Sequence, residues 1–142
     1  MLKTFNFNKM PIVDVVNEII IDAINNGASD IHFDPSEDML RVRVRIDGVL
    51  QNYSSIPNSY KNNLITRIKI LASMNITETR LPQDGAIKSV LKGINLDLRV
   101  SCLPTKRGEK IVIRILDYSM SLRGIEYLYF NESNYQKILK ML

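Results

Sequence analysis

The chain contains the segment Arg41-Val42-Arg43-Val44-Arg45-Ile46-Asp47-Gly48, in which basic and apolar residues alternate before an Asp-Gly pair. An alternation of period two predicts a β-strand, because successive side chains of a strand point to opposite faces of a sheet. This strand would bury its apolar residues and present three guanidinium groups on the other face. The Asp-Gly pair predicts a tight hairpin, since both residues tolerate the positive φ angles of a type I′ turn.

The three arginines of this segment need partners on the face that they share. Like charges side by side repel one another, so water, acidic neighbours or an anionic ligand must lie against them. The whole chain has 19 Lys and Arg residues against 15 Asp and Glu residues, which gives a net charge of +4. This modest excess permits an anionic partner and does not require nucleic acid.

The composition is typical of one soluble globular domain. The chain has 142 residues, of which 45% are hydrophobic and 24% are charged, and this composition supports a packed core and argues against disorder. No apolar run approaches the roughly 18 residues of a membrane-spanning helix, and residues 1–8 lack the apolar core of a signal peptide. The single Cys102 excludes an internal disulfide framework and a cysteine-based zinc site, and fits a reducing compartment.

Two segments have the three- and four-residue apolar spacing of amphipathic helices. The first covers residues 11–27, where Gly27 suits the left-handed position that follows a helix. The second covers residues 57–74. Arg67 and Lys69 flank its apolar seam, so the pattern favours a solvated position for both side chains.

The remaining segments predict strands joined by turns. Residues 111–116 are almost continuously apolar, which is typical of a strand buried on both faces, so we expect Arg114 to have a fixed partner. His32 is the only histidine, and we expect it to form structural hydrogen bonds rather than to bind a metal. Residues 104–110 read as a basic, glycine-containing loop. The predicted strands cover residues 28–33, 40–46, 49–53, 86–91, 94–103 and 111–116.

The motifs of the common catalytic sites are missing from the sequence. There is no phosphate-binding loop of the Gly-x-x-x-x-Gly-Lys-Ser/Thr type, no Gly-x-Gly-x-x-Gly and no metal-ligand spacing. A Ser–His–acid set could be drawn from many serines and His32, but no pattern places such residues together. We therefore expect this chain alone to catalyse no reaction.

Several short motifs follow one another in a fixed order. Each is weak alone, but the ordered set is highly specific. Over residues 11–142 it closely resembles the domain that precedes the motor domain in the type II secretion and type IV pilus assembly ATPases. The motifs are Ala28-Ser29-Asp30-Ile31-His32, Arg43-x-Arg45-Ile46-Asp47-Gly48, Arg67-Ile68-Lys69, Arg80-x-Pro82-Gln83-Asp84-Gly85, Leu98-Arg99-Val100-Ser101, Pro104-Thr105, Gly108-Glu109 and Arg114-Ile115-Leu116-Asp117.

The resemblance implies a PAS-like α+β domain, with an antiparallel sheet flanked by helices. It divides the chain into an N-terminal tail at residues 1–10, the PAS-like domain at residues 11–118, and a linker and helix at residues 119–142. That last segment would lead into a RecA-like ATPase domain that this sequence does not include. The family's additional N-terminal domain, and with it any contact to a membrane-bound partner, is also expected to be absent.

The resemblance further implies a function for the parent protein. Such proteins work as homo-hexamers that hydrolyse ATP with Mg²⁺ at the cytoplasmic face of the inner membrane, where an inner-membrane platform protein, and not nucleic acid, is the partner. Nucleotide binds between the two domains, and arginines of this domain reach its phosphates. Matched residue by residue, the candidates are Arg45 and Arg67, with Arg43 third. Pilus assembly, secretion and DNA-uptake motors share these motifs, so the motifs do not choose among them.

One departure and two alternatives accompany this interpretation. Family members often have an arginine directly after Pro-Gln-Asp-Gly, where this chain has Ala86. The first alternative is a stand-alone PAS-like or nucleic-acid-binding module, in which the arginine strand and Lys106-Arg107 would contact phosphates. Against nucleic acid, no aromatic platform interleaves with the arginines. The second alternative is an oligomerisation element without a ligand.

Overall fold

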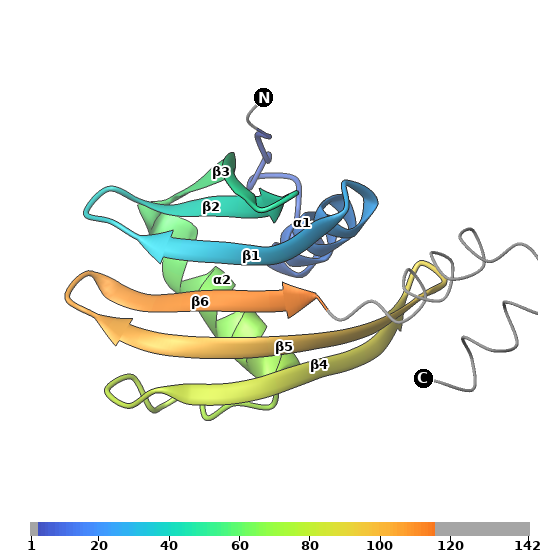
Figure 1. Ribbon diagram of the computed structural model, residues 1–142. Helices are drawn as coiled ribbons and strands as arrows, with labels where there is room; N and C mark the ends of the chain where they lie inside the picture. The colour runs from blue at the N-terminus through green and yellow to red at the C-terminus, as the bar shows by residue number, and fades with distance from the viewer. Residues whose placement is uncertain (1–2, 116–142) are drawn as a thin grey trace, which may run out of the picture.

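The computed structural model describes residues 3–115, which form one sheet covered by two helices (Figure 1). The six strands are antiparallel in the order β3-β2-β1-β6-β5-β4, and α1 and α2 contact each other on one face. This arrangement confirms the α+β class with an antiparallel sheet. The expected linker and helix over residues 119–142 lie outside the described residues. The elements are α1 (Ile12–Asn25), β1 (Ala28–Pro35), β2 (Met39–Ile46), β3 (Val49–Pro57), α2 (Asn58–Leu71), β4 (Gln83–Leu91), β5 (Ile94–Thr105) and β6 (Gly108–Ile115).

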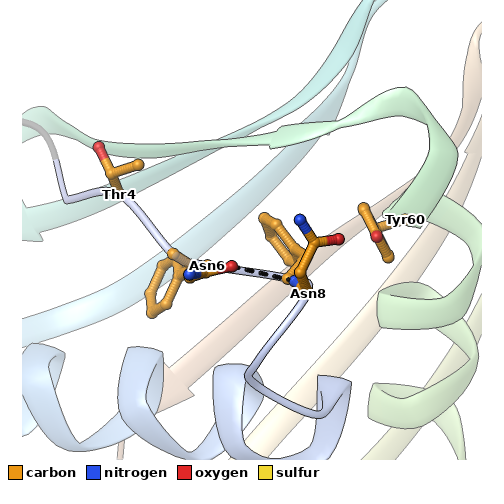
Figure 2. A pocket seen from close by; sticks show the side chains of 6 residues that line it. Thr4, Asn6, Asn8 and Tyr60 are labelled. Atoms are coloured by element: carbon orange, nitrogen blue, oxygen red, sulfur yellow. Dashed lines mark hydrogen bonds between the residues drawn. The ribbon is translucent and has the colours of Figure 1, made fainter.

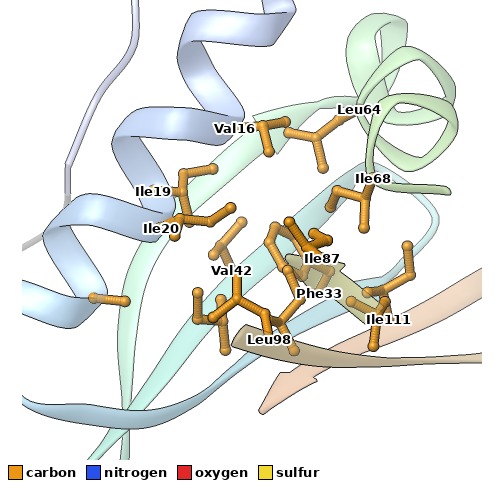
Figure 3. Close-up of a cluster of buried hydrophobic side chains, with 14 of the residues drawn as sticks. Val16, Ile19, Ile20, Phe33, Val42, Leu64, Ile68, Ile87, Leu98 and Ile111 are labelled. Atoms are coloured by element: carbon orange, nitrogen blue, oxygen red, sulfur yellow. The ribbon is translucent and has the colours of Figure 1, made fainter. Parts of the chain in front are cut away.

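The hydrophobic core lies between the two helices and one face of the sheet (Figure 3). Each strand of the centre buries alternate residues, as period-two patterning requires. Burying a side chain of this size contributes about 1.5–3 kcal/mol relative to leaving it in water. The core therefore fixes which face of each strand is open. Its labelled members are Val16, Ile19, Ile20, Phe33, Val42, Leu64, Ile68, Ile87, Leu98 and Ile111.

The predicted turns of the arginine hairpin and of the first helix are confirmed. Asp47 and Gly48 have φ angles of 52° and 79°, as a type I′ hairpin requires. Gly27, with φ of 72°, follows α1 in the left-handed conformation. The local chemistry of these turns thus sets the start of β1, the end of β2 and the start of β3.

The prediction of a loop over residues 104–110 is wrong. Here β5 continues to Thr105 and β6 starts at Gly108, because the ladder pairs Pro104 with Glu109 and Thr105 with Gly108. A backbone ladder does not need apolar side chains. A proline fits at this end of β5, since the pairing of β4 with β5 reaches only to Cys102 and leaves that edge free.

The expectation of a buried Arg114 with a fixed partner is also wrong. Its neighbours Ile111 and Ile113 are fully buried against the helices, whereas Arg114 is exposed on the opposite face. Within residues 3–115 no ion pair to its guanidinium is found. The apolar residues 111–116 suggested a strand buried on both faces, but within residues 3–115 helices cover only one face of this sheet.

Candidate functional site

Two of the three candidate arginines lie together on the open face of the sheet. In Figure 1 the strands lie in front of α2, so this face is turned toward the viewer. The valines of β2 pack into the core, and the arginines of β2 therefore point away from the helices. The antiparallel register sets Arg41 opposite Asp34, Arg43 opposite His32 and Arg45 opposite Asp30.

Arg43 is held by an ion pair inside the domain. Its Nη2 and Nε donate to Oδ2 of Asp34 at 2.6 and 3.1 Å, and Lys110 Nζ lies 3.1 Å from the other carboxylate oxygen. Burial acts to raise the pKa of Asp34, but the hydrogen bonds from Arg43 and Lys110 outweigh it and hold this pKa below its usual range. Arg43 can reach an external ligand only by leaving Asp34.

Arg45 is held more loosely than Arg43. Its Nε lies 3.4 and 3.5 Å from the two oxygens of Asp30, its Nη1 donates to the Gly48 carbonyl oxygen at 3.1 Å, and its side chain is 37% exposed. Asp30 also accepts a hydrogen bond from Ser29 at 2.7 Å and contacts His32 Nε2 at 2.5 Å. Arg45 therefore keeps an exposed guanidinium edge, and the hydrogen-bonding role expected for His32 is confirmed.

The same contacts hold Asp30 in its charged form. Burial acts to raise the pKa of Asp30, but the hydrogen bonds from Ser29 and His32 and the charge of Arg45 outweigh it and lower this pKa. The carboxylate is thus shared among several donors. Among the residues that the structure describes, part of the positive charge on this face therefore has no dedicated counterion.

Arg67 lies on the other side of the sheet from Arg45. It belongs to α2, which packs against the core face, and its Nε is buried without a hydrogen-bond partner among the described residues. The structure therefore brings Arg43 and Arg45 together and separates both from Arg67.

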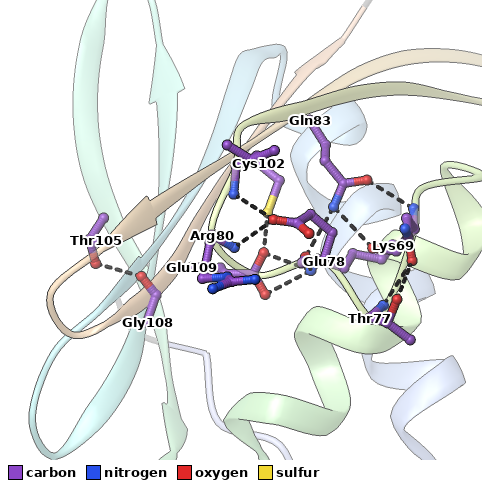
Figure 4. A network of polar contacts seen from close by, with 11 residues as sticks. Lys69, Thr77, Glu78, Arg80, Gln83, Cys102, Thr105, Gly108 and Glu109 are labelled. Carbon is purple, nitrogen blue, oxygen red and sulfur yellow. Dashed lines mark hydrogen bonds and ion pairs between the residues drawn. The ribbon is translucent and has the colours of Figure 1, made fainter.

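A buried ion pair that sequence reasoning missed lies beneath α2 (Figure 4). Lys69, expected to be solvated, is only 1% exposed, and its Nζ lies 2.6 Å from Glu109 Oε2 and donates to the Glu78 carbonyl oxygen at 2.9 Å. The Cys102 thiol donates to Glu109 at 3.0 Å, and burial together with this carboxylate raises the pKa of the thiol to about 12. The expected solvated position of Lys69 is therefore wrong.

The contacts around Lys69 fix the connection between α2 and β4. Gln83 donates to the carbonyl oxygens of Asn75 and Glu78, and it accepts a hydrogen bond from the Asn75 backbone (Figure 4). A Cβ atom on Gly85 would lie 2.4 Å from the Ala72 carbonyl oxygen, so only glycine lets β4 pass the end of α2. The Gln-Asp-Gly motif therefore has a structural explanation. A local sequence pattern cannot predict an ion pair such as that of Lys69 and Glu109, because the two residues lie 40 positions apart in the chain.

Two surface hollows lie away from the arginine candidates. The first, of about 480 Å³, is formed where residues 3–10 pack on the domain (Figure 2). These residues, set apart as a tail by sequence analysis, bury Phe5 and stack Phe7 on Tyr60 at 4.5 Å between ring centroids. The second, of about 400 Å³, is lined by Ser36, Glu37, Lys61, Lys106 and Arg107.

Residues 3–115 show neither a membrane-spanning helix nor a cluster of metal-binding side chains. In that part of the chain, no helix is long and apolar enough to span a bilayer. The same residues contain no group of three or more His, Cys, Asp or Glu side chains placed to hold a metal ion.

Comparison with known proteins places these features in a family. The type II/IV secretion system protein family matches residues 6–142. The type IV pilus assembly ATPase PilB of Acinetobacter baylyi is 46% identical over 122 residues, which cover 85% of this chain and 21% of the relative. The type II secretion system protein E of Xanthomonas campestris is 43% identical over 135 residues, which cover 95% of this chain and 24% of the relative.

A solved structure supports the fold. The X-ray structure of the Legionella pneumophila ATPase DotB has a TM-score of 0.52 to this chain at 14% sequence identity, and the match covers 80% of this chain and 31% of DotB. The chain spans about a fifth to a quarter of the length of the two relatives from Acinetobacter baylyi and Xanthomonas campestris. The match over residues 6–142 and these identities show that the chain belongs to the type II/IV secretion system protein family.

Proposed function

We propose that this chain is the PAS-like domain of a pilus assembly or secretion ATPase and supplies positive charge to ATP held mainly by a RecA-like domain of the parent protein. The names of the relatives support this assignment, since several are ATPases of pilus assembly and secretion. The observation that supports it most is the loosely held, partly exposed side chain of Arg45. Its guanidinium is partly exposed, and its contacts to Asp30 are long enough to be exchanged for contacts to a phosphate.

The chemistry of Arg45 suits this role. A guanidinium presents a planar fork of donors that matches phosphate oxygens, and it stays charged at any physiological pH. An arginine brought in by a second domain can neutralise charge on the transferring γ-phosphoryl group, an effect worth roughly 10³–10⁵ in rate in other nucleotide hydrolases. Because its contacts would differ between ATP and ADP, the same residue would couple the nucleotide state to the angle between domains.

The other two candidates receive different parts in this proposal. Arg43 reaches phosphate only after release from Asp34, and in the resting domain it positions β2 against β1. Arg67, in the helix layer, approaches nucleotide from another side of the domain than Arg45. We assign the Mg²⁺ that accompanies ATP to the RecA-like domain.

The wider assembly follows from the same proposal. We propose that the parent protein forms a homo-hexamer at the cytoplasmic face of the inner membrane and acts there on a platform protein of the machine, without binding nucleic acid. The relatives are proteins of pilus assembly and of type II secretion, which supports a place in such a machine.

The experiment that tests the role of Arg45 uses the full-length parent protein. We expect Arg45→Ala to lower ATP hydrolysis at least tenfold, since contributions of this kind reach roughly 10³–10⁵. Arg41→Ala is the matched control, because Arg41 lies on the same strand and face and is exposed. Thermal unfolding of each variant checks the fold. Unchanged hydrolysis with unchanged stability in Arg45→Ala would overturn the proposal.

A further inference from the structure

The motif Ser29-Asp30-Ile31-His32 gives the carboxylate of Asp30 two hydrogen-bond donors from its own strand. Ser29 Oγ donates to Oδ1 of Asp30 at 2.7 Å, and His32 Nε2 lies 2.5 Å from Oδ2. The ring nitrogen must carry the proton in this contact, because a carboxylate only accepts. Each oxygen of Asp30 therefore has a short partner on β1, before Arg45 of β2 is considered.

A β-bulge at Ser29 accompanies the first of these contacts. The register pairs Ala28 with Ile46 and Asp30 with Arg45, so β1 uses two residues where β2 uses one. The extra residue, Ser29, is exposed, and its hydroxyl donates to the carboxylate that follows it. Bulges commonly redirect a side chain in this way. The local backbone thus brings the serine donor to Asp30.

Asp34 shows how an arginine of β2 binds when an oxygen is left open to it. Asp34 also belongs to β1, and Lys110 lies 3.1 Å from its Oδ1. Within residues 3–115 no donor of β1 reaches its Oδ2, and Arg43 closes on that oxygen with Nη2 at 2.6 Å and Nε at 3.1 Å. Arg45 stays 3.4 and 3.5 Å from the oxygens of Asp30. The two arginines differ because the donors on β1 differ.

His32 is the better shielded of the two donors to Asp30. The side chains of both residues are only 14% exposed, so little water competes for their contact. Ser29, by contrast, is exposed. Within the described part of the chain, Nδ1 of His32 is buried without a partner, so Asp30 alone orients the ring by hydrogen bonding. The histidine and the carboxylate therefore hold each other.

Loss of the His32 donor would change what Arg45 does. Oδ2 of Asp30 would then lack its short partner in a poorly solvated place, which is costly for a charged acceptor. The guanidinium of Arg45 already lies beside this carboxylate and can supply the missing hydrogen bond. An arginine tied in this way has to break an ion pair before it can contact an external anion.

We propose that Ser29 and His32 are positioning residues, which occupy the oxygens of Asp30 and so keep Arg45 free to contact a phosphate of the nucleotide. This inference rests on the proposed function of Arg45. It gives a role to the Ala-Ser-Asp-Ile-His motif, whose polar side chains the packing of the core does not require. Both residues act through Arg45, and neither has to touch the nucleotide.

The test on the chain of 142 residues needs no nucleotide. It measures by NMR how fast the Nε–H of Arg45 exchanges with water, because a hydrogen bond to a carboxylate protects this proton. We expect His32→Leu to slow the exchange about tenfold, the equivalent of one charge-assisted hydrogen bond gained by Arg45. His32→Gln should keep the rate of the natural chain, because its amide nitrogen can donate to Asp30 in place of Nε2.

Two serine variants separate this effect from a loss of structure. Ser29→Ala removes the donor to Oδ1 from an exposed position and should slow the exchange at Arg45 in the same direction, even if His32→Leu does not fold. Ser101→Ala removes a similar hydrogen bond, to Asp84 at 3.0 Å, and should leave Arg45 unaffected.

Three results would refute the positioning role. They are unchanged exchange at Arg45 in a folded His32→Leu chain, a His32→Gln chain that behaves like His32→Leu, and equal slowing in Ser29→Ala and Ser101→Ala. If His32→Leu does not fold, unchanged exchange in Ser29→Ala refutes it instead.

Hydrolysis by the parent protein separates this proposal from the one on which it rests. His32→Leu should lower kcat/KM for ATP about tenfold and His32→Gln should not, because an arginine held by Asp30 is available for a small fraction of the time. If Arg45→Ala leaves hydrolysis unchanged while His32→Leu slows exchange at Arg45, the hold on Asp30 stands and the proposed function of Arg45 falls. If Arg45→Ala lowers hydrolysis while His32→Leu changes neither exchange nor kcat/KM, the function of Arg45 stands and the role of His32 falls.

Discussion

Asp34 decides which arginine of β2 is free to bind a ligand. Its carboxylate forms ion pairs with Arg43 Nη2 at 2.6 Å and with Lys110 Nζ at 3.1 Å, and its side chain is only 21% exposed. Among residues 3–115, Arg45 has no equivalent partner, since Asp30 divides its oxygens among several donors. Residues that look alike in the sequence therefore differ in how readily they can leave the sheet.

The lowered pKa of Asp34 gives a pH-dependent contribution to stability. A carboxylate whose pKa is lower in the folded chain stabilises the fold above the unfolded pKa of about 3.9, and this contribution is lost as the pH falls through the folded value. We expect Asp34→Asn to cost about 1.5 kcal/mol at pH 7. The cost should shrink below about pH 4, where both chains carry a neutral side chain.

Urea unfolding of Asp34→Asn and the natural chain between pH 7 and pH 3 measures this difference. Asp38→Asn is the control, because Asp38 is exposed in the turn between β1 and β2. A penalty that is the same at both ends of the pH range would mean that Asp34 acts through packing and not through its charge.

At the level of the elements, Lys69 and Glu109 join α2 to the β5–β6 pair. Both side chains are largely buried, with 2% and 12% exposure, and the lysine also holds the Glu78 carbonyl oxygen. A charge removed from such a pair leaves its partner uncompensated in a poorly solvated place. The pair therefore controls how α2 and the residues up to Gln83 sit on the sheet.

We expect Lys69→Met to lower the free energy of unfolding by about 3–5 kcal/mol, because Glu109 would then be buried without a partner. The double variant Lys69→Met with Glu109→Gln removes both charges and should recover a large part of this loss. Chemical unfolding of the single and double variants provides the measurement. A double variant as unstable as Lys69→Met alone would show that the methylene packing of Lys69, not its charge, matters.

The elements also show what the sequence could and could not predict. The alternation from Arg41 to Ile46 and the Asp47-Gly48 pair predicted a strand and a hairpin because both signals are local. Strand pairing between β1 and β6, which are about 80 residues apart, leaves no local signal. The place of Arg114 opposite Asp30 depends on that pairing, and the burial of Lys69 depends on Glu109, which is 40 residues away in the sequence.

At the scale of the whole molecule, the helices described within residues 3–115 cover one face of the sheet, and charged side chains lie on much of the other. Within that part of the chain, the second face is available to a further layer. The shared face of Arg43 and Arg45 could be predicted from the sequence, whereas the place of Arg67, in α2 on the other side of the sheet, could not; the nucleotide-binding role of all three stays a prediction. Which face a residue belongs to is a property of the folded sheet and could not be read from the motif that contains it.

A face that offers only donors to phosphate should bind without catalysing. The chain has no Gly-x-x-x-x-Gly-Lys-Ser/Thr loop to cradle the β- and γ-phosphates, and arginines alone do not position an attacking water. We therefore expect no ATP hydrolysis by residues 1–142 in a phosphate-release assay, under conditions in which the full-length parent turns over. The decisive comparison is with Arg45→Ala in the same chain: phosphate release that survives repeated purification and is lost in this variant would mean that the open face catalyses hydrolysis by itself, and the division of labour between two domains would have to be abandoned.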